Sequence, residues 1–335
     1  MAKLLVTGGA GFIGSNFIRF STRSRPQDSI VNLDLLTHAG SKDHLMDGAK
    51  SRVRFVKGDI GNSKLVQTLM KGADGVIHFA AETHVDRSIL DSQIFLKTNV
   101  LGTQTLLEAA RKNKIRRFIF ISTDEVYGSV AWGSSREDAP LRPNSPYSAS
   151  KASADLLCRA YFMTHGLPVI ITRSCNNYGP WQFPEKVIPL FITNMIEGKS
   201  VPLYGKGENV REWIHVNDHA RAIERVFEKG EPGEIYNIGS GFEINNDDLA
   251  KKLVNAFGKG EESIQRVQDR PGHDLRYSLN SAKIRSLGWK PEIRFEVGIK
   301  ETIDWYQANR GWWEKIKGNR RYRSYIKKQY AERVK

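Results

Sequence analysis

Short apolar runs recur along the first half of the chain, and each ends in small or polar residues. They span 3–7, 30–33, 53–56, 76–79, 118–121 and 168–173. Apolar runs of this length, separated by helical patterns, are typical of buried parallel strands. The pattern predicts an α/β fold, a Rossmann doubly wound parallel sheet with a smaller C-terminal α/β domain.

A glycine-rich segment follows the first predicted strand. Gly9, Gly11 and Gly14 satisfy G-x-G-x-x-G directly before a helical pattern. Glycine permits the tight turn and the close approach of backbone to a pyrophosphate, and the helix N-terminus offers N–H groups to the phosphates. Asp34, about 20 residues further on, can accept hydrogen bonds from the adenosine ribose and would repel a 2′-phosphate. The segment therefore predicts NAD rather than NADP.

Two adjacent carboxyl side chains follow the apolar run 118–121. Asp124 and Glu125 leave the carboxyl end of a predicted strand, where ligands bind in open α/β sheets. Neighbouring carboxyls can act as an acid and a base if their environments separate their pKa values. An Asp-Glu pair taken alone is usually a solvated turn, so this interpretation depends on the motifs around it.

Tyr147 and Lys151 are four residues apart in a segment that predicts a helix start. Residues at i and i+4 share a helix face, and a nearby ammonium would lower the pKa of the phenol. Tyr147 is then a candidate base for a sugar hydroxyl. Tyr-x-x-x-Lys is common by chance, and it gains weight here from the glycine segment and from the Ser122–Thr123 strand end.

Together these motifs resemble the extended short-chain dehydrogenase/reductases and, within them, the nucleotide-sugar 4,6-dehydratases. The resemblance runs from residue 3 to about residue 313. It includes the Asp-Glu pair before Val-Tyr-Gly, which related 4-epimerases and decarboxylases usually lack. Other matching stretches are 80–88, 175–180 and 270–274.

The resemblance implies an internal redox reaction on a nucleotide sugar that regenerates NAD at each turnover. Tyr147 would take the C4 hydroxyl proton as hydride leaves for NAD. Glu125 would remove the C5 proton, and Asp124 would protonate the departing C6 hydroxyl. Hydride would return to C6, C5 would be reprotonated, and a 4-keto-6-deoxy sugar would result. Thr123 is implied to bind the C4 oxygen, and Lys151 to hold the nicotinamide ribose.

The motifs and the resemblance also give two sets of binding residues. The cofactor set is Gly8, Gly11, Phe12, Ile13, Gly14, Asp34, Thr37, Asp59, Ile60, Ala80, Ala81, Thr98, Tyr147, Lys151 and Asn177. The substrate set is Thr83, Thr123, Asn176, Glu185, Lys186, Pro202, Tyr204, Arg211, Arg270 and His273. Both arginines are candidates for the diphosphate because guanidinium forks match phosphate oxygens. No metal ligands are expected.

Several alternatives stay open. dTDP-glucose is the implied substrate, but Phe242 stands where the family usually offers an Asn, so UDP-glucose is a second candidate. Near the adenine end, Leu35 and His38 stand where a Lys and a Tyr are expected. A 4-epimerase or decarboxylase would leave Asp124 and Glu125 idle. A regulatory NAD-binding protein would have no use for the whole catalytic set.

Composition changes after residue 173, where Pro and aromatic residues become frequent through 178–184. We expect a cofactor domain over 1–175, with a return strand near 210–240. A substrate domain would then occupy most of 176–330, and a basic tail 315–335. A homodimer through the helix around 101–110 and the helix carrying Tyr147 is implied by the resemblance.

The net charge of +14 would favour a dianionic sugar nucleotide. Much of it lies in the tail, which we expect to be a solvated helix end rather than a nucleic-acid or lipid contact, because no recognised nucleic-acid fold accompanies it. Two cysteines form no disulfide framework and show no metal spacing. No apolar run is long enough to span a membrane. The cysteine count and the absence of a membrane span predict a soluble protein of the cytoplasm.

Overall fold

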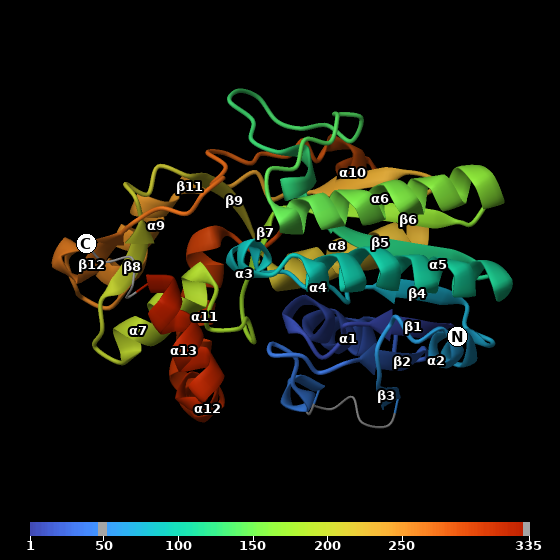
Figure 1. The fold of residues 1–335 in the computed structure, drawn as a ribbon, viewed down its shortest axis with the longest axis horizontal. Coiled ribbons are helices and arrows are strands. Elements are labelled where there is room, and N and C mark those ends of the chain that lie inside the picture. Colours follow the sequence, from blue (N-terminus) through green and yellow to red (C-terminus); the bar gives the residue numbers. More distant parts are fainter. Residues whose placement is uncertain (46–51, 331–335) are drawn as a thin grey trace.

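A seven-stranded parallel sheet forms the centre of the computed structural model, which describes residues 1–45 and 52–330 (Figure 1). Its strand order is β10-β6-β5-β4-β1-β2-β3. The order reverses between β1 and β4, which is the switch point of a doubly wound sheet. The predicted Rossmann architecture is confirmed. The strands are β1 (Lys3–Thr7), β2 (Ser29–Asp34), β3 (Val53–Lys57), β4 (Gly75–His78), β5 (Arg117–Thr123), β6 (Val169–Ser174) and β10 (Ile235–Ile238).

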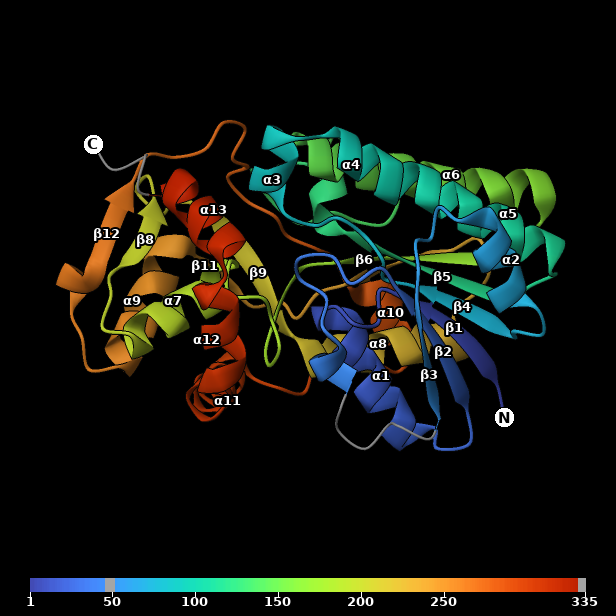
Figure 2. The ribbon, with the colours of Figure 1, turned by 60° about the horizontal axis from the view of Figure 1, so that its bottom comes forward.

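Helices cover both faces of this sheet (Figure 2). Successive side chains of a strand point to opposite faces. Leu4 accordingly joins the core formed with α1 and α8, and Leu5 the core formed with α2, α5 and α6. On the first face lie α1 (Phe12–Ser24), α8 (Val216–Lys229) and α10 (Ala282–Ser286); on the second lie α2 (Ser63–Met70), α3 (Val85–Leu90), α4 (Gln93–Phe95), α5 (Thr103–Lys112) and α6 (Pro146–His165).

A second, smaller unit carries its own sheets and its own core. Strand β9 lies between β11 and β7, and β8 pairs with β12. The strands are β7 (Asn176–Tyr178), β8 (Val201–Tyr204), β9 (Val210–His215), β11 (Glu243–Asn245) and β12 (Ile264–Val267). The helices are α7 (Val187–Ile196), α9 (Asn246–Ala256), α11 (Phe295–Ala308), α12 (Arg310–Gly318) and α13 (Arg320–Tyr330). No helix in the described part of the chain is both long and apolar enough to cross a bilayer.

The chain passes back into the first unit after β9. Helix α8 packs on the main sheet, and β10 pairs with β6 in parallel, so this stretch contains the strand expected to return to the sheet. Strand β9 itself belongs to the smaller unit, where it pairs with β7. Helix α10 contacts β10 and brings the chain to the first unit once more. The two units therefore share the chain in alternating pieces.

Helix α13 corrects the expectation of a solvated tail. Its residues Tyr322 and Gln329 are buried, and the Tyr322 hydroxyl donates to the carbonyl of Pro184 at 2.7 Å. Only the opposite face, which includes Arg323 and Lys327, is exposed. Residues 331–335 of the predicted basic tail lie outside the described residues. The described part of this tail is a packed element of the smaller unit.

Candidate active site

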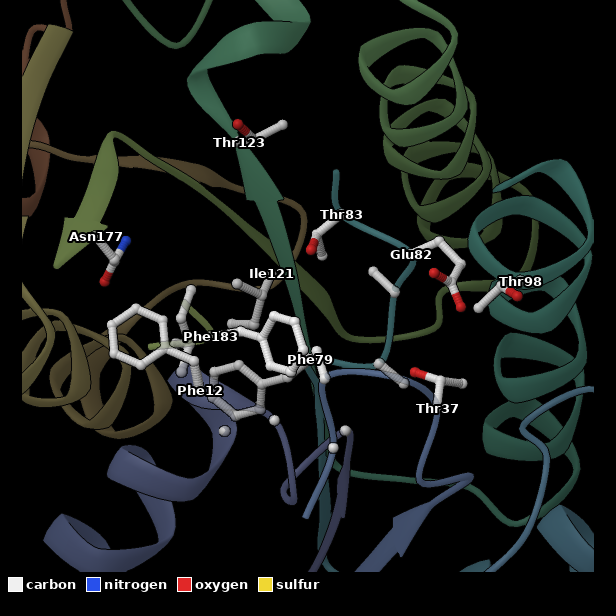
Figure 3. A pocket seen from close by; sticks show the side chains of 18 of the residues that line it. Phe12, Thr37, Phe79, Glu82, Thr83, Thr98, Ile121, Thr123, Asn177 and Phe183 are labelled. Carbon is white, nitrogen blue, oxygen red and sulfur yellow. The ribbon is translucent and has the colours of Figure 1, made fainter. Parts of the chain in front are cut away.

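A pocket runs along the carboxyl ends of the central strands and reaches into the smaller unit (Figure 3). Every residue expected to bind the cofactor, from Gly8 to Asn177, lines it. The five expected catalytic residues line the same pocket, beginning with Thr123 at the end of β5. The structure therefore brings these two predicted sets together, while their chemical roles stay a prediction.

The glycine segment forms a close turn beside β4. Gly8 has φ +74°, and a Cβ there would lie 2.5 Å from the amide nitrogen of Ala80. A Cβ on Gly14 would lie 2.4 Å from the carbonyl oxygen of Gly8. Helix α1 begins after Gly11, which provides no side-chain cap for the first turn. This backbone arrangement fits a pyrophosphate, which can approach the segment closely and accept from its amides.

Asp34 ties the glycine segment to the loop after β2. One carboxylate oxygen accepts from the amide of Ala10 at 2.9 Å, and the other accepts from that of Leu36 at 2.8 Å. Burial raises the pKa of this carboxyl. Each oxygen keeps a second acceptor position. His44 holds the same segment by donating from Nδ1 to the carbonyl of Ala10 at 2.7 Å. The acceptor positions that remain on Asp34 fit a ribose diol.

A π-helix, η2 (Leu96–Gly102), follows α4 and lies on another side of the pocket. Its Thr98 lines the pocket, where Figure 3 shows it beside Glu82. Asn99 accepts from the Glu82 amide at 2.9 Å and donates to the Glu82 carbonyl at 3.0 Å. Burial raises the pKa of Glu82, and His38 and Arg87 oppose the shift. π-Helical turns are often found at functional sites, and this one fixes Glu82, a pocket residue that the sequence analysis missed.

Thr123 ends β5 and begins the short helix η3 (Asp124–Tyr127). Its hydroxyl donates to the Asp124 carboxyl at 3.1 Å and accepts from the amide of Glu125 at 3.3 Å. The other Asp124 oxygen has no hydrogen-bond partner within the described residues. The two carboxyls therefore leave the same strand end but occupy different environments.

Burial raises the pKa of Asp124 well above its usual value, and the charges of Glu125 and Glu212 raise it further. Burial also raises the pKa of Glu125, but there Arg270 and Lys186 lower it. Carboxyls whose environments separate their pKa values can serve as an acid and a base. Asp124 thus faces other carboxyls, whereas Glu125 also faces cations, so the two environments differ as those of an acid and a base would.

Tyr147 and Lys151 both lie on α6, but the expected effect of Lys151 on the phenol is wrong for this structure. The ammonium donates to the carbonyl of Ile121 at 2.6 Å, and burial lowers its pKa to about 8. Burial raises the pKa of Tyr147, and Glu125 and Asp124 raise it further. The charges that act on the phenol are carboxylates, so ionisation of Tyr147 needs a positive charge that these residues do not supply.

The expected substrate residues divide into two groups. Thr83, Thr123, Asn176, Glu185 and Lys186 line the pocket. Pro202, Tyr204, Arg211, Arg270 and His273 do not line it. Two members of this second group still lie close enough to Glu125 to lower its pKa, namely Arg270 and Arg211. Arg270 and Arg211 therefore lie near the two carboxyls, while a role of Pro202, Tyr204 and His273 in binding a substrate stays a prediction.

The two arginines differ in how far their donors are already used. Arg211 donates to the carbonyl oxygens of Val210 at 2.7 Å and Asp274 at 2.9 Å. Arg270 reaches Asp86 at 3.5 Å, and its buried Nε has no partner among the described residues. A buried donor without a partner is costly unless a ligand satisfies it. Arg270 is therefore the better candidate for the diphosphate.

Several further pocket residues were missing from the sequence-based sets, among them Gln182, Phe183 and His219. Gln182 and Phe183 line the pocket from the Pro-rich and aromatic stretch that follows β7. That change of composition was visible, but no motif singled them out. His219 on α8 also lines the pocket; both its ring nitrogens lack partners among the described residues, and burial lowers its pKa to about 3. A lone histidine in a helix carries no spacing signal, and burial favours the neutral form of this one.

A family model described as GDP-mannose 4,6-dehydratase matches residues 5–302. The chain belongs to this dehydratase family. It is 50% identical over 321 residues to a dTDP-glucose 4,6-dehydratase from Streptomyces niveus, with 94% of this chain and 96% of that protein covered.

Two solved structures show that proteins with different activities share the fold of this chain. DesIV from Streptomyces venezuelae, a dTDP-glucose 4,6-dehydratase crystallised with NAD, is 52% identical with TM-score 0.91, covering 94% of this chain and 99% of its own. A Thermus thermophilus UDP-glucose 4-epimerase in complex with NAD is 31% identical with TM-score 0.84, covering 92% and 99%. The fold alone does not separate dehydratase from epimerase, so the assignment must come from the catalytic residues.

Proposed function

We propose that the chain catalyses NAD-dependent dehydration of dTDP-glucose to dTDP-4-keto-6-deoxyglucose, as a hydro-lyase. The observation that carries this proposal is the pair Asp124 and Glu125, which lines one pocket with Tyr147 and has an acid environment beside a base environment. An epimerase needs only the redox base, whereas elimination of water also needs an acid and a base.

The glycine segment, Asp34, Thr98 and Lys151 would hold NAD along the strand ends. When bound, NAD accepts a hydride from the sugar and gives it back within the same turnover. Tyr147 takes the proton of the C4 hydroxyl. The Thr123 hydroxyl donates a hydrogen bond to that oxygen by turning its single proton away from Asp124. The positive charge that the phenol needs would come from the oxidised nicotinamide ring, since Lys151 is engaged by the carbonyl of Ile121.

The two carboxyl groups, Asp124 and Glu125, carry out the elimination of water. Oxidation at C4 acidifies the proton at C5, and Glu125 removes it. Asp124, kept neutral by its raised pKa, gives its proton to the C6 oxygen, which leaves as water. Proton transfer by a positioned side chain contributes a factor of about 10² to 10⁴ to the rate. The two residues together account for a step that a 4-epimerase does not perform.

The thymidine nucleotide is supported by the relatives. The proteins from Streptomyces niveus and Streptomyces venezuelae are both dTDP-glucose 4,6-dehydratases, at 50% and 52% identity. Arg270, with an unsatisfied buried Nε, is the candidate partner of the diphosphate. UDP-glucose shares the sugar and the diphosphate and differs only in the nucleobase, so it remains the second candidate.

A homodimer is part of the proposal. Large apolar side chains are exposed along α3, α4, η2 and α6, which lie side by side on one face of the molecule (Figure 2). Contiguous exposed apolar surface marks interaction sites. The residues are Ile89, Leu90, Ile94, Leu96, Leu101, Leu156 and Met163. The double change Leu101→Glu and Met163→Glu should halve the mass measured by light scattering, and an unchanged mass would argue against this face.

The test of the reaction is mass spectrometry of dTDP-glucose and UDP-glucose, each incubated separately with the purified protein. Loss of one water without net consumption of added NAD is the expected result, with dTDP-glucose reacting faster. An unchanged mass with both sugars would contradict the proposal. A product of unchanged mass that separates from its substrate by chromatography would instead indicate a 4-epimerase.

A further inference from the structure

Arg173 is a buried arginine on β6 whose presence the proposed reaction does not explain. It does not line the pocket that contains Asp124 and Tyr147. A buried charge is tolerated only where it is paired and hydrogen-bonded. The partners of Arg173 come from α6 and from η3, which are the two helices that carry most of the expected catalytic residues.

The first partner of Arg173 is Asp155 on α6. The pair is bidentate, since Nε and Nη2 of the guanidinium donate to the two Asp155 oxygens, each at 2.9 Å. Asp155 follows Tyr147 and Lys151 at intervals of four residues, so the three side chains share one face of the helix. Lys151 is held on β5 by the carbonyl of Ile121, and Asp155 is held on β6 by Arg173. The ion pair therefore fixes the helix that carries Tyr147 to a second strand of the sheet (Figure 2).

The second partner of Arg173 is Tyr127, the last residue of η3. Nη1 of Arg173 donates to the Tyr127 hydroxyl at 2.8 Å, and this hydroxyl donates to Oδ1 of Asn237 on β10 at 2.8 Å. The guanidinium carbon lies 4.7 Å from the centroid of the Tyr127 ring, which adds a cation–π contact. Nη1 also donates to the carbonyl of Glu137 at 3.2 Å. One guanidinium thus connects η3 with α6.

The short helix η3 depends on such outside contacts for its position. It has only four residues, and a 3₁₀ turn has poorer hydrogen-bond geometry than an α-helix. At its start the Thr123 hydroxyl accepts from the amide of Glu125, and at its end Tyr127 is held by Arg173. Asp124 and Glu125 lie between these two points. A shift of Tyr127 would therefore move both carboxyls.

The effect of Arg173 on the acid is one of position rather than of charge. After burial, the charges that most shift the pKa of Asp124 are those of Glu125, Glu212 and Arg211. In a buried ion pair, desolvation offsets much of the attraction, so a gain in stability is a weak reason for its presence. A bidentate pair does supply a defined geometry.

We propose that Arg173 aligns the acid and base of the elimination with the base of the oxidation. Arg173 and Tyr127 act as positioning residues: they hold η3 against α6, so that Asp124 and Glu125 reach C6 and C5 of the sugar whose C4 hydroxyl Tyr147 deprotonates. This inference rests on the proposed function for the reaction. The competing interpretation is that the cluster stabilises the fold and affects no single step.

The experiment compares three variants of the full chain, each with NAD, with the unsubstituted protein. Tyr127→Phe removes only the hydroxyl, and Arg173→Lys keeps the charge without the fork that joins Asp155 to Tyr127. Tyr236→Phe is the matched control, because Tyr236 is buried in the same core, its hydroxyl accepts from the amide of Glu231 at 3.1 Å, and it does not line the pocket. We would measure Tm, the Kd of dTDP, kcat for water loss, and the fraction of reduced cofactor at steady state by absorbance.

Tyr127→Phe and Arg173→Lys should lower kcat by about 10- to 100-fold, because misplacing a reacting group by about 1 Å can cost about 100-fold in rate, and should change the Kd of dTDP less than about twofold. Oxidation at C4 should continue on α6 while elimination slows, so the fraction of reduced cofactor should rise. Tyr236→Phe should lower Tm as Tyr127→Phe does and leave kcat and the reduced fraction unchanged. If Arg173→Lys does not fold, Tyr127→Phe carries the test.

An unchanged kcat in folded Tyr127→Phe would overturn the inference. A fall in kcat without a rise in the reduced fraction would do the same, as would an equal fall in Tyr236→Phe, since either result would mean that the cluster only supports the fold. Failure of the proposed function would appear in the unsubstituted protein, as no water loss from dTDP-glucose and no reduced cofactor. That result would also remove the elimination on which the inference rests.

Discussion

The two ends of the site are built in different ways. Most of the expected cofactor residues follow strand ends of one sheet in the first unit, and all of them share one pocket. The exceptions are Thr98 on η2, Tyr147 and Lys151 on α6, and Asn177 on β7. The expected nucleotide end instead draws on β8, β9 and the segment around Arg270, and five of the expected substrate residues lie outside that pocket. A binding motif at a single strand end can be recognised in a sequence. The way in which two units come together to form a site cannot.

The largest effect on the rate of water loss should come from a substitution of Glu125, which lies between the cofactor end and the nucleotide end of the site. Glu125→Gln should lower the rate of water loss by about 10² to 10⁴, because the amide cannot take the C5 proton. Oxidation at C4 should survive and be visible as a transient absorbance of reduced cofactor on mixing with dTDP-glucose.

Glu243→Gln is the matched control, since Glu243 pairs with Arg276 outside the pocket. Full water loss by Glu125→Gln would remove Glu125 from the elimination and reopen the epimerase assignment.

A pair of variants tests whether the two ends are separate. Arg270→Met should raise the KM for dTDP-glucose by about 10- to 100-fold, because a charged hydrogen bond is worth about 1.5–3 kcal/mol, and should leave NAD affinity unchanged. Asp34→Asn should weaken NAD by a smaller factor and leave the Kd of dTDP unchanged. Calorimetric titration with each ligand gives both values. If either variant lost affinity for NAD and for dTDP by the same factor, binding at the two ends would be coupled.

The cofactor end could be predicted in detail because its geometry follows from single residues. Gly8 and Gly14 are required where a Cβ would collide with backbone, and Asp34 is placed by the strand that precedes it. The effect of Lys151 on Tyr147 could not be predicted, because spacing on a helix does not reveal that the ammonium donates to Ile121. The π-helical turn that presents Glu82 likewise has no signature in the sequence.

The packing of helix α13 was not predicted because charged residues dominate its sequence. The segment 320–330 is dominated by Lys and Arg, so it was interpreted as solvated. Yet Tyr322, Tyr325, Gln329 and Tyr330 recur at helical spacing, and this stripe is the face that packs. The signal was an aromatic stripe within a basic helix. What no sequence pattern could give was the target of that stripe, since Tyr330 stacks on Tyr204 and Tyr325 lies against Arg87, both far away along the chain.

The pH dependence should show the different environments of the two carboxyls. Water loss should increase with pH as Glu125 ionises, above the usual range of a glutamate because burial raises its pKa, and should fall again as Asp124 loses its proton. Glu212→Gln removes a negative charge that raises the pKa of Asp124, so the falling limb should move to lower pH.

The profile of kcat against pH measures both limbs. A falling limb that stays in place in the Glu212→Gln variant would mean that Asp124 does not set it.

The smallest effect concerns stability. The pKa of Asp124 is raised in the folded state, so its contribution is fully present below the pKa of the unfolded carboxyl and declines as pH rises toward the folded value. Asp124→Asn keeps the shape without the ionisation. Its stability relative to the unsubstituted protein should therefore increase with pH, by on the order of 1 kcal/mol for each pH step through which the carboxyl stays protonated. Urea unfolding at pH 5 and pH 8 would measure it, and an equal difference at both values would argue against a raised pKa.

The position of α13 in the chain orders the events of synthesis. A nascent chain that has emerged as far as β10 already contains every residue that lines the pocket and every strand of the main sheet. Arg270 and α13 leave the ribosome later. A product cut short before Arg270 would carry every residue that lines the pocket, including the expected cofactor residues and both carboxyls. It would lack Arg270 and the helices α11, α12 and α13 of the smaller unit.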